Sequence, residues 1–295
     1  MIAFADRLVE AVRRKGSPLC VGLDPLPDRI PALFGETNSP EALRKFGEEI
    51  VALAARHAAV LKPQLGFFEP YGPEGVAAAR DFTTHARDKG MIVLLDAKRG
   101  DIGSTAEGYA RACLGPAPGY DADCVTVNPY LGRDSLEPFL KLAEQNRKGV
   151  AVLVRTSNPG ARDMQDLQVG NAPLWSRAAQ MIAPLAPRLK GASGWSGLMA
   201  VAGATYPEEA HALRETLPKS LFLVPGYGAQ GASAADAVAG FMNGPHGREG
   251  GIVSSSRAVL YPEAATTAKT LTDWRAAIET AMKSASAELA AACAV

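Results

Sequence analysis

One apolar segment of the sequence ends in a cluster of alternating charges. Within LLDAKRGDIGST, residues 94–105, Asp96, Lys98 and Asp101 follow a run that is typical of a buried strand. Residues two apart in an extended strand face the same side, so we expect Asp96 and Lys98 to point together, with Asp101 at the turn that follows. A lysine held by carboxylates stays charged despite burial, and can stabilise and then protonate a developing negative charge.

A second lysine strengthens this interpretation. Lys62 lies in the apolar run VLKPQ, residues 60–64, which is the strand-like segment before the one that ends in Asp96. If the two strands are neighbours, Lys62, Asp96, Lys98 and Asp101 form one network. The alternative is a structural ion pair or a solvated loop, because charged clusters also occur for those reasons. The position of Lys62 inside an apolar run argues against that alternative.

Eight short apolar runs alternate with amphipathic or alanine-rich stretches long enough for helices. The strand-like runs are residues 19–24, 60–68, 91–98, 123–129, 149–156, 197–204, 221–228 and 250–257. Buried strands that alternate with helices predict a parallel sheet covered on its outside. Eight such units in 295 residues favour one α/β domain over residues 1–295, a single (β/α)8 TIM barrel.

In such a barrel the chemistry occurs where strands end and the following loops begin. The polar residues at those positions are Asp24, Lys62, Asp96, Lys98, Asp101, Asn128, Ser157, Gln230 and Arg257. Two connections are longer than a simple link requires, residues 25–40 and 157–174, and long loops of this kind often close over a site.

Composition excludes several classes of protein. Lys plus Arg and Asp plus Glu are both 31, so the formal net charge is zero, and we expect no nucleic-acid or membrane partner. No CxxC, HxH or HExxH motif occurs, so we expect no metal site. Neither a signal-peptide pattern nor a stretch of about 18 uninterrupted apolar residues is found, and we expect a cytoplasmic protein.

Several motifs together resemble the orotidine 5′-phosphate decarboxylase family, in particular its longer bacterial subfamily. The central motif is DAKRGDIGST, with Lys62 one strand earlier. The other motifs follow in the same order as in that family: VGLDP (21–25), TSNPGA (156–161), PGYGAQG (225–231) and SSSR (254–257). The central motif DAKRGDIGST is quite specific on its own. The other motifs are specific mainly through their order, and the match extends from residue 20 to 257.

This resemblance implies a homodimeric (β/α)8 barrel that converts orotidine 5′-monophosphate to UMP and carbon dioxide, the last step of de novo pyrimidine nucleotide synthesis. It implies no metal and no organic cofactor. Lys98 would donate the proton to C6, Asp96 would lie beside the departing carboxylate, and Lys62 would hold Asp96 and the ribose.

The resemblance also assigns residues to substrate binding. Asp24 would bind a ribose hydroxyl, and Ser157 and Gln230 would contact the base. Arg257 and backbone amides around Gly228 and Gly251 would hold the phosphate. Asp101, Ile102 and Thr105 would reach into the partner subunit's site, so that the two active sites of the dimer are shared.

Other functions remain open at this point. A magnesium-dependent sugar-phosphate lyase on the same barrel shares the DxKxxD pattern but has an acidic residue where this chain has Lys62. A Schiff-base aldolase needs a lysine of lowered pKa, which Asp96 and Asp101 oppose. A non-catalytic phosphate-ligand sensor would not need all four charged residues. GYGAQG (226–231) matches a dinucleotide-binding motif, but the strand after it ends in Arg257 instead of an acidic residue.

Overall fold

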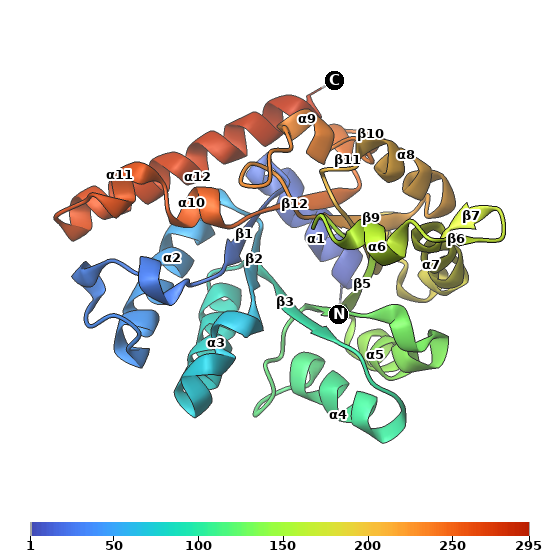
Figure 1. The fold of residues 1–295 in the computed structure, drawn as a ribbon, viewed down its shortest axis with the longest axis horizontal. Coiled ribbons are helices and arrows are strands. Elements are labelled where there is room, and N and C mark those ends of the chain that lie inside the picture. Colours follow the sequence, from blue (N-terminus) through green and yellow to red (C-terminus); the bar gives the residue numbers. More distant parts are fainter. Residues whose placement is uncertain (1, 295) are drawn as a thin grey trace.

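Eight parallel strands close into a barrel in the computed structural model, which describes residues 2–294 (Figure 1). The strands are β1 (Leu19–Leu23), β2 (Val60–Pro63), β3 (Ile92–Arg99), β4 (Cys124–Val127), β5 (Gly149–Arg155), β8 (Ser196–Ala202), β9 (Ser220–Val224) and β12 (Gly251–Ser255). Their order around the barrel is β1-β12-β9-β8-β5-β4-β3-β2, so β1 closes the sheet against β12. The (β/α)8 barrel predicted from the sequence is therefore confirmed.

Helices surround the barrel, as the amphipathic segments predict. The longer ones are α2 (Pro40–His57), α3 (Gly72–Asp88), α4 (Gly103–Leu114), α5 (Arg133–Asn146), α7 (Leu174–Ile182), α8 (Pro207–Thr216) and α12 (Leu271–Cys293). Short helices are α6 (Ala161–Gln165), α9 (Ala234–Ala237), α10 (Arg257–Leu260) and α11 (Glu263–Thr266), and two small hairpins are β6 (Gln168–Val169) with β7 (Ala172–Pro173) and β10 (Met242–Gly244) with β11 (Gly247–Glu249).

Two segments differ from their predicted structure. The apolar run 60–68 is a strand only as far as Pro63, and continues as a 3-10 turn over Leu65–Phe67. Gln64 still donates its amide to Leu23 and forms a single bridge with Asp96, and the chain turns away after it, where the Gln64 side chain accepts the amide of Gly66. The long connection 157–174 is also more structured than a plain loop, because it contains α6 and the β6–β7 hairpin.

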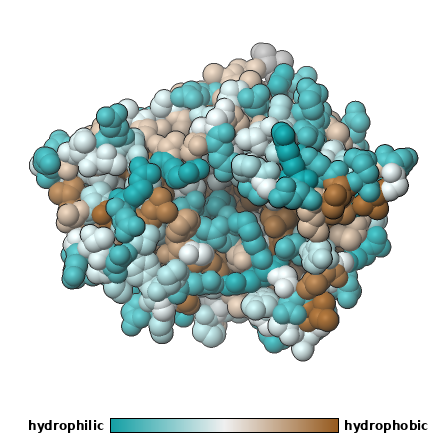
Figure 2. Space-filling model, in the orientation of Figure 1, coloured by the Kyte–Doolittle hydropathy of each residue, from teal (hydrophilic) through white to brown (hydrophobic). Residues whose placement is uncertain are grey.

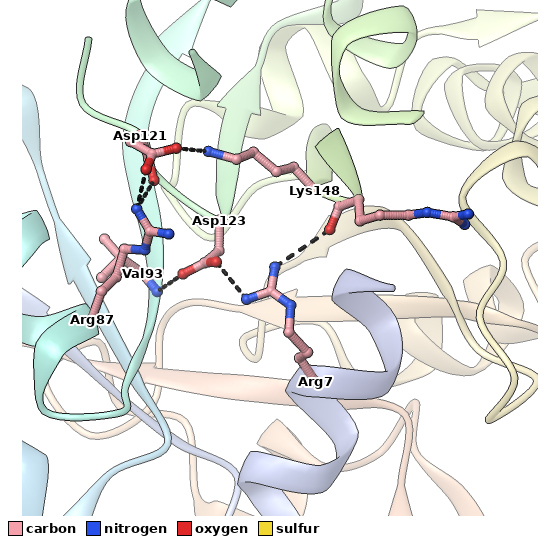
Figure 3. A network of polar contacts seen from close by, with 7 residues as sticks. Arg7, Arg87, Val93, Asp121, Asp123 and Lys148 are labelled. Carbon is pink, nitrogen blue, oxygen red and sulfur yellow. Dashed lines mark hydrogen bonds and ion pairs between the residues drawn. The ribbon is translucent and has the colours of Figure 1, made fainter. Parts of the chain in front are cut away.

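The amino-terminal helix α1 (Phe4–Lys15) closes the end of the barrel where the strands begin. Phe4 packs against Gly149 and Gly197, where a Cβ atom would lie 2.5 and 2.9 Å from its ring. Below it, Arg7 of α1 donates a 2.6 Å hydrogen bond to Asp123, which also accepts the amide of Val93 (Figure 3). Glycine at the two strand starts thus makes room for an aromatic plug.

A second set of charges stabilises the same end of the molecule. Arg87 of α3 and Lys148, which precedes β5, both contact the carboxylate of Asp121 (Figure 3). In a TIM barrel, the end where the strands begin usually contributes to stability, whereas catalysis takes place at the end where the strands finish. We therefore assign these ion pairs to holding the strand starts together.

Arg214 of α8 is buried and has no carboxylate partner within residues 2–294, and we expect it to be the most important polar residue for stability at the β9–β12 side. Its guanidinium lies 3.8 Å from the centre of the Phe222 ring. It donates hydrogen bonds to four backbone carbonyls, those of Leu217, Ser220, Gly240 and Gly250. Arg214→Met removes all four hydrogen bonds, although the carbonyls of Leu217 and Gly250 keep a backbone donor, so we expect the free energy of unfolding in urea to fall by about 3 kcal/mol. The exposed Arg111→Met is the control, and equal stability of both variants would contradict this assignment.

Candidate active site

Four charged side chains meet where β1, β2 and β3 end. Lys62 Nζ lies 2.7 Å from Asp96 Oδ2, and Lys98 Nζ lies 2.6 Å from Asp96 Oδ1. Asp24, which follows β1, has its Oδ1 3.9 Å from Lys62 Nζ. Adjacent parallel strands end at the same rim, so segments about 35 residues apart in the sequence place these groups together. The result is one chain of alternating charges, Asp24–Lys62–Asp96–Lys98.

Burial makes this pairing strong. The Lys62 and Asp96 side chains are only 7% and 10% exposed, whereas that of Lys98 is 47% exposed. Burial alone would raise the pKa of Asp96, but Lys62 and Lys98 outweigh it and hold that pKa well below its usual range. Burial would likewise lower the pKa of Lys62, but Asp96 and Asp24 raise it above its ordinary value. Both groups are therefore ionised at neutral pH.

These shifts predict how stability depends on pH. Because the pKa of Asp96 is lower in the folded chain, its ionisation stabilises the fold above the unfolded pKa, and this contribution is lost as the pH falls below about 4. We expect the free energy of unfolding, measured in urea between pH 3 and 7, to fall less steeply with acid in Asp96→Asn than in the unmodified chain. Identical slopes would show that Asp96 does not contribute.

A bulge in β3 determines where Lys98 points. The pairing of β3 with β4 shifts between Leu95 and Arg99, and Lys98 has φ +46°, which is unusual for a residue other than glycine. The amides of Ala97 and Lys98 both donate 2.9 Å hydrogen bonds to Thr126 Oγ1. The simple alternation of an extended strand predicted that Asp96 and Lys98 lie together. They do, but through a bulge that turns the Lys98 side chain back toward Asp96.

Thr126 of β4 is a site residue that sequence analysis missed. Its hydroxyl accepts the two amides of the bulge and donates a 3.0 Å hydrogen bond to Asp96 Oδ1. Asp96 Oδ1 therefore accepts hydrogen bonds from both Thr126 and Lys98, and Asp96 Oδ2 accepts one from Lys62. Threonine in a buried strand is common, so its residue type alone gave no signal; only its position opposite the β3 bulge indicates its function.

We expect Thr126→Val to reduce kcat by about tenfold to a hundredfold, because valine keeps the shape but releases both the bulge and Asp96. Steady-state kinetics would measure this effect. Thr84→Val is a matched control on the exposed side of α3, where the hydroxyl contacts only its own helix. An unchanged kcat in Thr126→Val would contradict a positioning role.

A cavity of about 480 Å³ opens above these charges. Figure 2 shows hydrophilic surface around a hollow near the middle of this face. Besides the charged network, residues predicted from the sequence line it: Ser157 after β5, Gln230 in the loop after β9, and Arg257 at the start of α10. Asp24 also lines the cavity, and its buried Oδ1 accepts no hydrogen bond from residues 2–294.

Of the two glycines predicted to hold the phosphate, one lies far from the cavity and the other lies beside it. Gly251 is the first residue of β12, at the opposite end of the barrel, and its neighbours are Phe222 and Phe241; the prediction that it holds phosphate is wrong. The family resemblance alone had assigned it to the phosphate site. Gly228 does belong to the loop beside the cavity, but its amide donates to the carbonyl of Ala232 and is already used. Its contribution is a turn with φ +71°.

The predicted network also differs at Asp101. Within one chain this carboxylate accepts the amide of Ile102, 2.8 Å away, and contacts neither lysine. Ile102 is 55% exposed, and Thr105 on α4 is exposed as well. None of the three lines the cavity of its own chain. The network of a single chain therefore contains Asp24 instead of Asp101.

Fold and charged rim together define a barrel enzyme with its site at the carboxyl ends of the strands. The sequence model of the orotidine 5′-phosphate decarboxylase / HUMPS family matches residues 17–269. The chain belongs to this family. It is 41% identical over 273 residues to the orotidine 5′-phosphate decarboxylase of Rhodopirellula baltica, covering 88% of this chain and 89% of the relative.

Other similar proteins carry the same family name. The orotidine 5′-phosphate decarboxylase of Haloarcula marismortui is 42% identical over 259 residues, covering 88% of this chain and 87% of the relative. The solved structure of Leishmania donovani OMP decarboxylase is 31% identical, with a TM-score of 0.76 over 98% of this chain and 99% of that one. The reaction is the decarboxylation of orotidine 5′-monophosphate to UMP in pyrimidine biosynthesis, and the enzyme is a carboxy-lyase.

Proposed function

We propose that Lys98 carries the chemical step of this decarboxylation. The bond between C6 and the carboxylate breaks, carbon dioxide leaves, and the electron pair stays on C6. Lys98 Nζ then gives its proton to C6, and the neutral amine regains a proton from water. The observation that supports this role is the 2.6 Å contact of Lys98 Nζ with Asp96, at the base of the cavity.

The chemistry requires a fixed positive charge at this point. The electron pair left on C6 lies in the plane of the pyrimidine ring, so the ring's π system cannot delocalise it. An ammonium group held beside C6 stabilises this charge electrostatically, and needs no reorganisation as the charge develops. General acid catalysis contributes about 10² to 10⁴ in rate, so Lys98 supplies part of the acceleration and binding of the remaining substrate supplies the rest.

Asp96 and Lys62 position the proton donor. We propose that Asp96 lies beside the departing carboxylate and fixes Lys98, while Lys62 fixes Asp96 from its other oxygen and reaches the ribose. Both contacts are hydrogen bonds between ionised groups, which are short and directional. The two lysines outweigh the effect of burial and keep Asp96 ionised next to a substrate carboxylate.

The rest of the cavity offers groups for each part of the nucleotide. Asp24, which lines the cavity and keeps part of its side chain exposed, would accept a hydrogen bond from a ribose hydroxyl. Ser157 and Gln230 would contact the base, and Arg257 together with the glycine-rich loop 225–231 would bind the phosphate. Remote binding of a dianion can supply energy for closing loops around the reacting ring.

We further propose a homodimer with shared active sites. Ile102 and Thr105 are exposed, Asp101 is partly exposed, and none of them lines the cavity of its own chain, which suits residues that complete a partner's site. Most of the exposed large apolar side chains fall in one part of the sequence, between 102 and 169: Ile102, Tyr109, Tyr130, Leu131, Met164, Leu167 and Val169. An apolar hollow of about 720 Å³ next to Thr156 lies in the same region. A second copy of the chain would cover such a surface.

The proposed reaction needs neither a metal nor an organic cofactor, because Lys62 supplies a cation where a magnesium-dependent lyase would have an acidic ligand. Within residues 2–294, no helix is both long and apolar enough to cross a membrane. We propose a cytoplasmic enzyme without a nucleic-acid or membrane partner, in keeping with its zero formal net charge.

The test is to incubate the purified chain with orotidine 5′-monophosphate and a metal chelator while following the orotate absorbance and the appearance of UMP. We expect rapid conversion that added magnesium does not accelerate. Conversion that requires magnesium would overturn the proposed mechanism. No conversion by folded protein would leave a phosphate-binding protein that only keeps the motifs of its family.

A further inference from the structure

The loop between β9 and α9, residues 225–233, is rich in glycine. Three of its glycines, Gly226, Gly228 and Gly231, have positive φ values of 71–103°. The loop is closed by local hydrogen bonds, in which the amide of Gly228 donates to Ala232 and that of Gly231 to Gly228. Glycine adopts many backbone conformations, so a loop of this composition keeps one shape only when other parts of the molecule hold it.

The space behind the loop is not filled. A hollow of about 450 Å³ separates it from the carboxyl-terminal helix α12, and Gly228, Ser255, Ala281 and Ser284 are among its lining residues. Tyr227 and Ala232 of the loop join the hydrophobic core, but the hollow leaves the loop only partly supported by packing on the side of α12. A directional contact across the hollow adds support there.

Tyr227 makes that contact. Its side chain lines both the catalytic cavity and the hollow behind it, and the residue is only 8% exposed. The hydroxyl donates a 2.8 Å hydrogen bond to Glu288 Oε2 on α12. The other oxygen of Glu288 accepts a 3.0 Å hydrogen bond from Ser284, one helical turn earlier. Ser284 thus fixes the carboxylate, and the carboxylate fixes the loop.

We propose that α12 holds the loop in its phosphate-binding shape through Tyr227 and Glu288, so that Glu288 is a positioning residue for the phosphate. The inference rests on the proposed binding of phosphate by this loop and Arg257. It also assigns a role to the alanine-rich carboxyl-terminal segment, for which the sequence gives no motif.

The test compares orotidine 5′-monophosphate with orotidine, which lacks the phosphate. In Tyr227→Phe and in Glu288→Gln, we expect kcat/KM for the nucleotide to fall about fivefold to tenfold, mainly through KM. We expect kcat/KM for orotidine to stay unchanged. The double variant should lose little more than either single one, because both remove the same contact. Glu215→Gln, at an exposed position of α8, is the control.

Arg257→Ala separates this inference from the assignment of the phosphate site. If Arg257→Ala weakens only the nucleotide while Tyr227→Phe and Glu288→Gln have no effect, the phosphate site stands and the role of α12 is overturned. Equal losses for nucleotide and orotidine in Tyr227→Phe would show a general structural role and overturn it too. If Arg257→Ala preserves the full advantage of the nucleotide over orotidine, both the phosphate assignment and the inference fail.

Discussion

Lys98→Ala is expected to lower kcat for orotidine 5′-monophosphate by at least about 10⁴-fold. The substitution removes the proton donor and the charge that stabilises C6 together, and each effect alone is worth about 10² to 10⁴. UMP should still bind, because Asp24, Ser157, Gln230 and Arg257 stay in place around the cavity. Turnover by absorbance and UMP binding by calorimetry measure the two effects separately.

A surface lysine provides the matched control for this experiment. Lys141 is exposed on α5, away from the cavity, so Lys141→Ala should leave both turnover and binding unchanged. Lys98 is about half-exposed, and its removal is not expected to unfold the chain. Residual turnover of Lys98→Ala within tenfold of the unmodified enzyme would rule it out as proton donor.

Mixing two inactive variants should restore activity if the active sites are shared. We expect Lys98→Ala and Asp101→Ala each to be nearly inactive alone. In a hybrid dimer, one site has Lys98 from one chain and Asp101 from the other, and is therefore complete. Random reassociation of equal amounts makes half of the dimers hybrids, so about a quarter of all sites should be active. Activity measured after denaturation and joint refolding tests this.

A second mixture serves as its control. Asp96 and Lys98 lie 2.6 Å apart in the same chain, so mixing Asp96→Ala with Lys98→Ala creates no complete site and should restore nothing. The presence of hybrids would be verified with chains of different affinity tags. Tagged hybrids of Lys98→Ala and Asp101→Ala that remain inactive would contradict the proposal that Asp101 serves the partner.

Sequence patterns predicted the barrel because its strands are buried on both faces. Each of the eight apolar runs overlaps one barrel strand, and the burial of whole strands such as Leu19–Leu23 explains the lack of alternation. Lys62 and Asp96 were recognisable for the same reason. A charged residue inside an apolar run must find a partner, and neighbouring parallel strands brought the two together.

Other features depend on geometry that no pattern encodes. Thr126 acts through a bulge whose position follows from the pairing of β3 with β4, and a threonine in a strand gives no hint of it. The resemblance assigned Gly251 to the phosphate site, but Gly251 begins β12, whereas Arg257 follows the end of that strand on the other side of the barrel. Tyr227 and Glu288 are 61 residues apart, and only the placement of α12 beside the loop shows their contact.

A crystal structure with bound UMP tests the central claim most directly. The account predicts that Lys98 Nζ lies within about 3.5 Å of C6, the distance of groups that are poised to react. It also predicts the ribose on Asp24, the phosphate on Arg257 and Asp101 from the partner subunit beside Lys98. A uracil ring bound with C6 away from Lys98, or with its phosphate away from Arg257, would contradict the proposed mechanism.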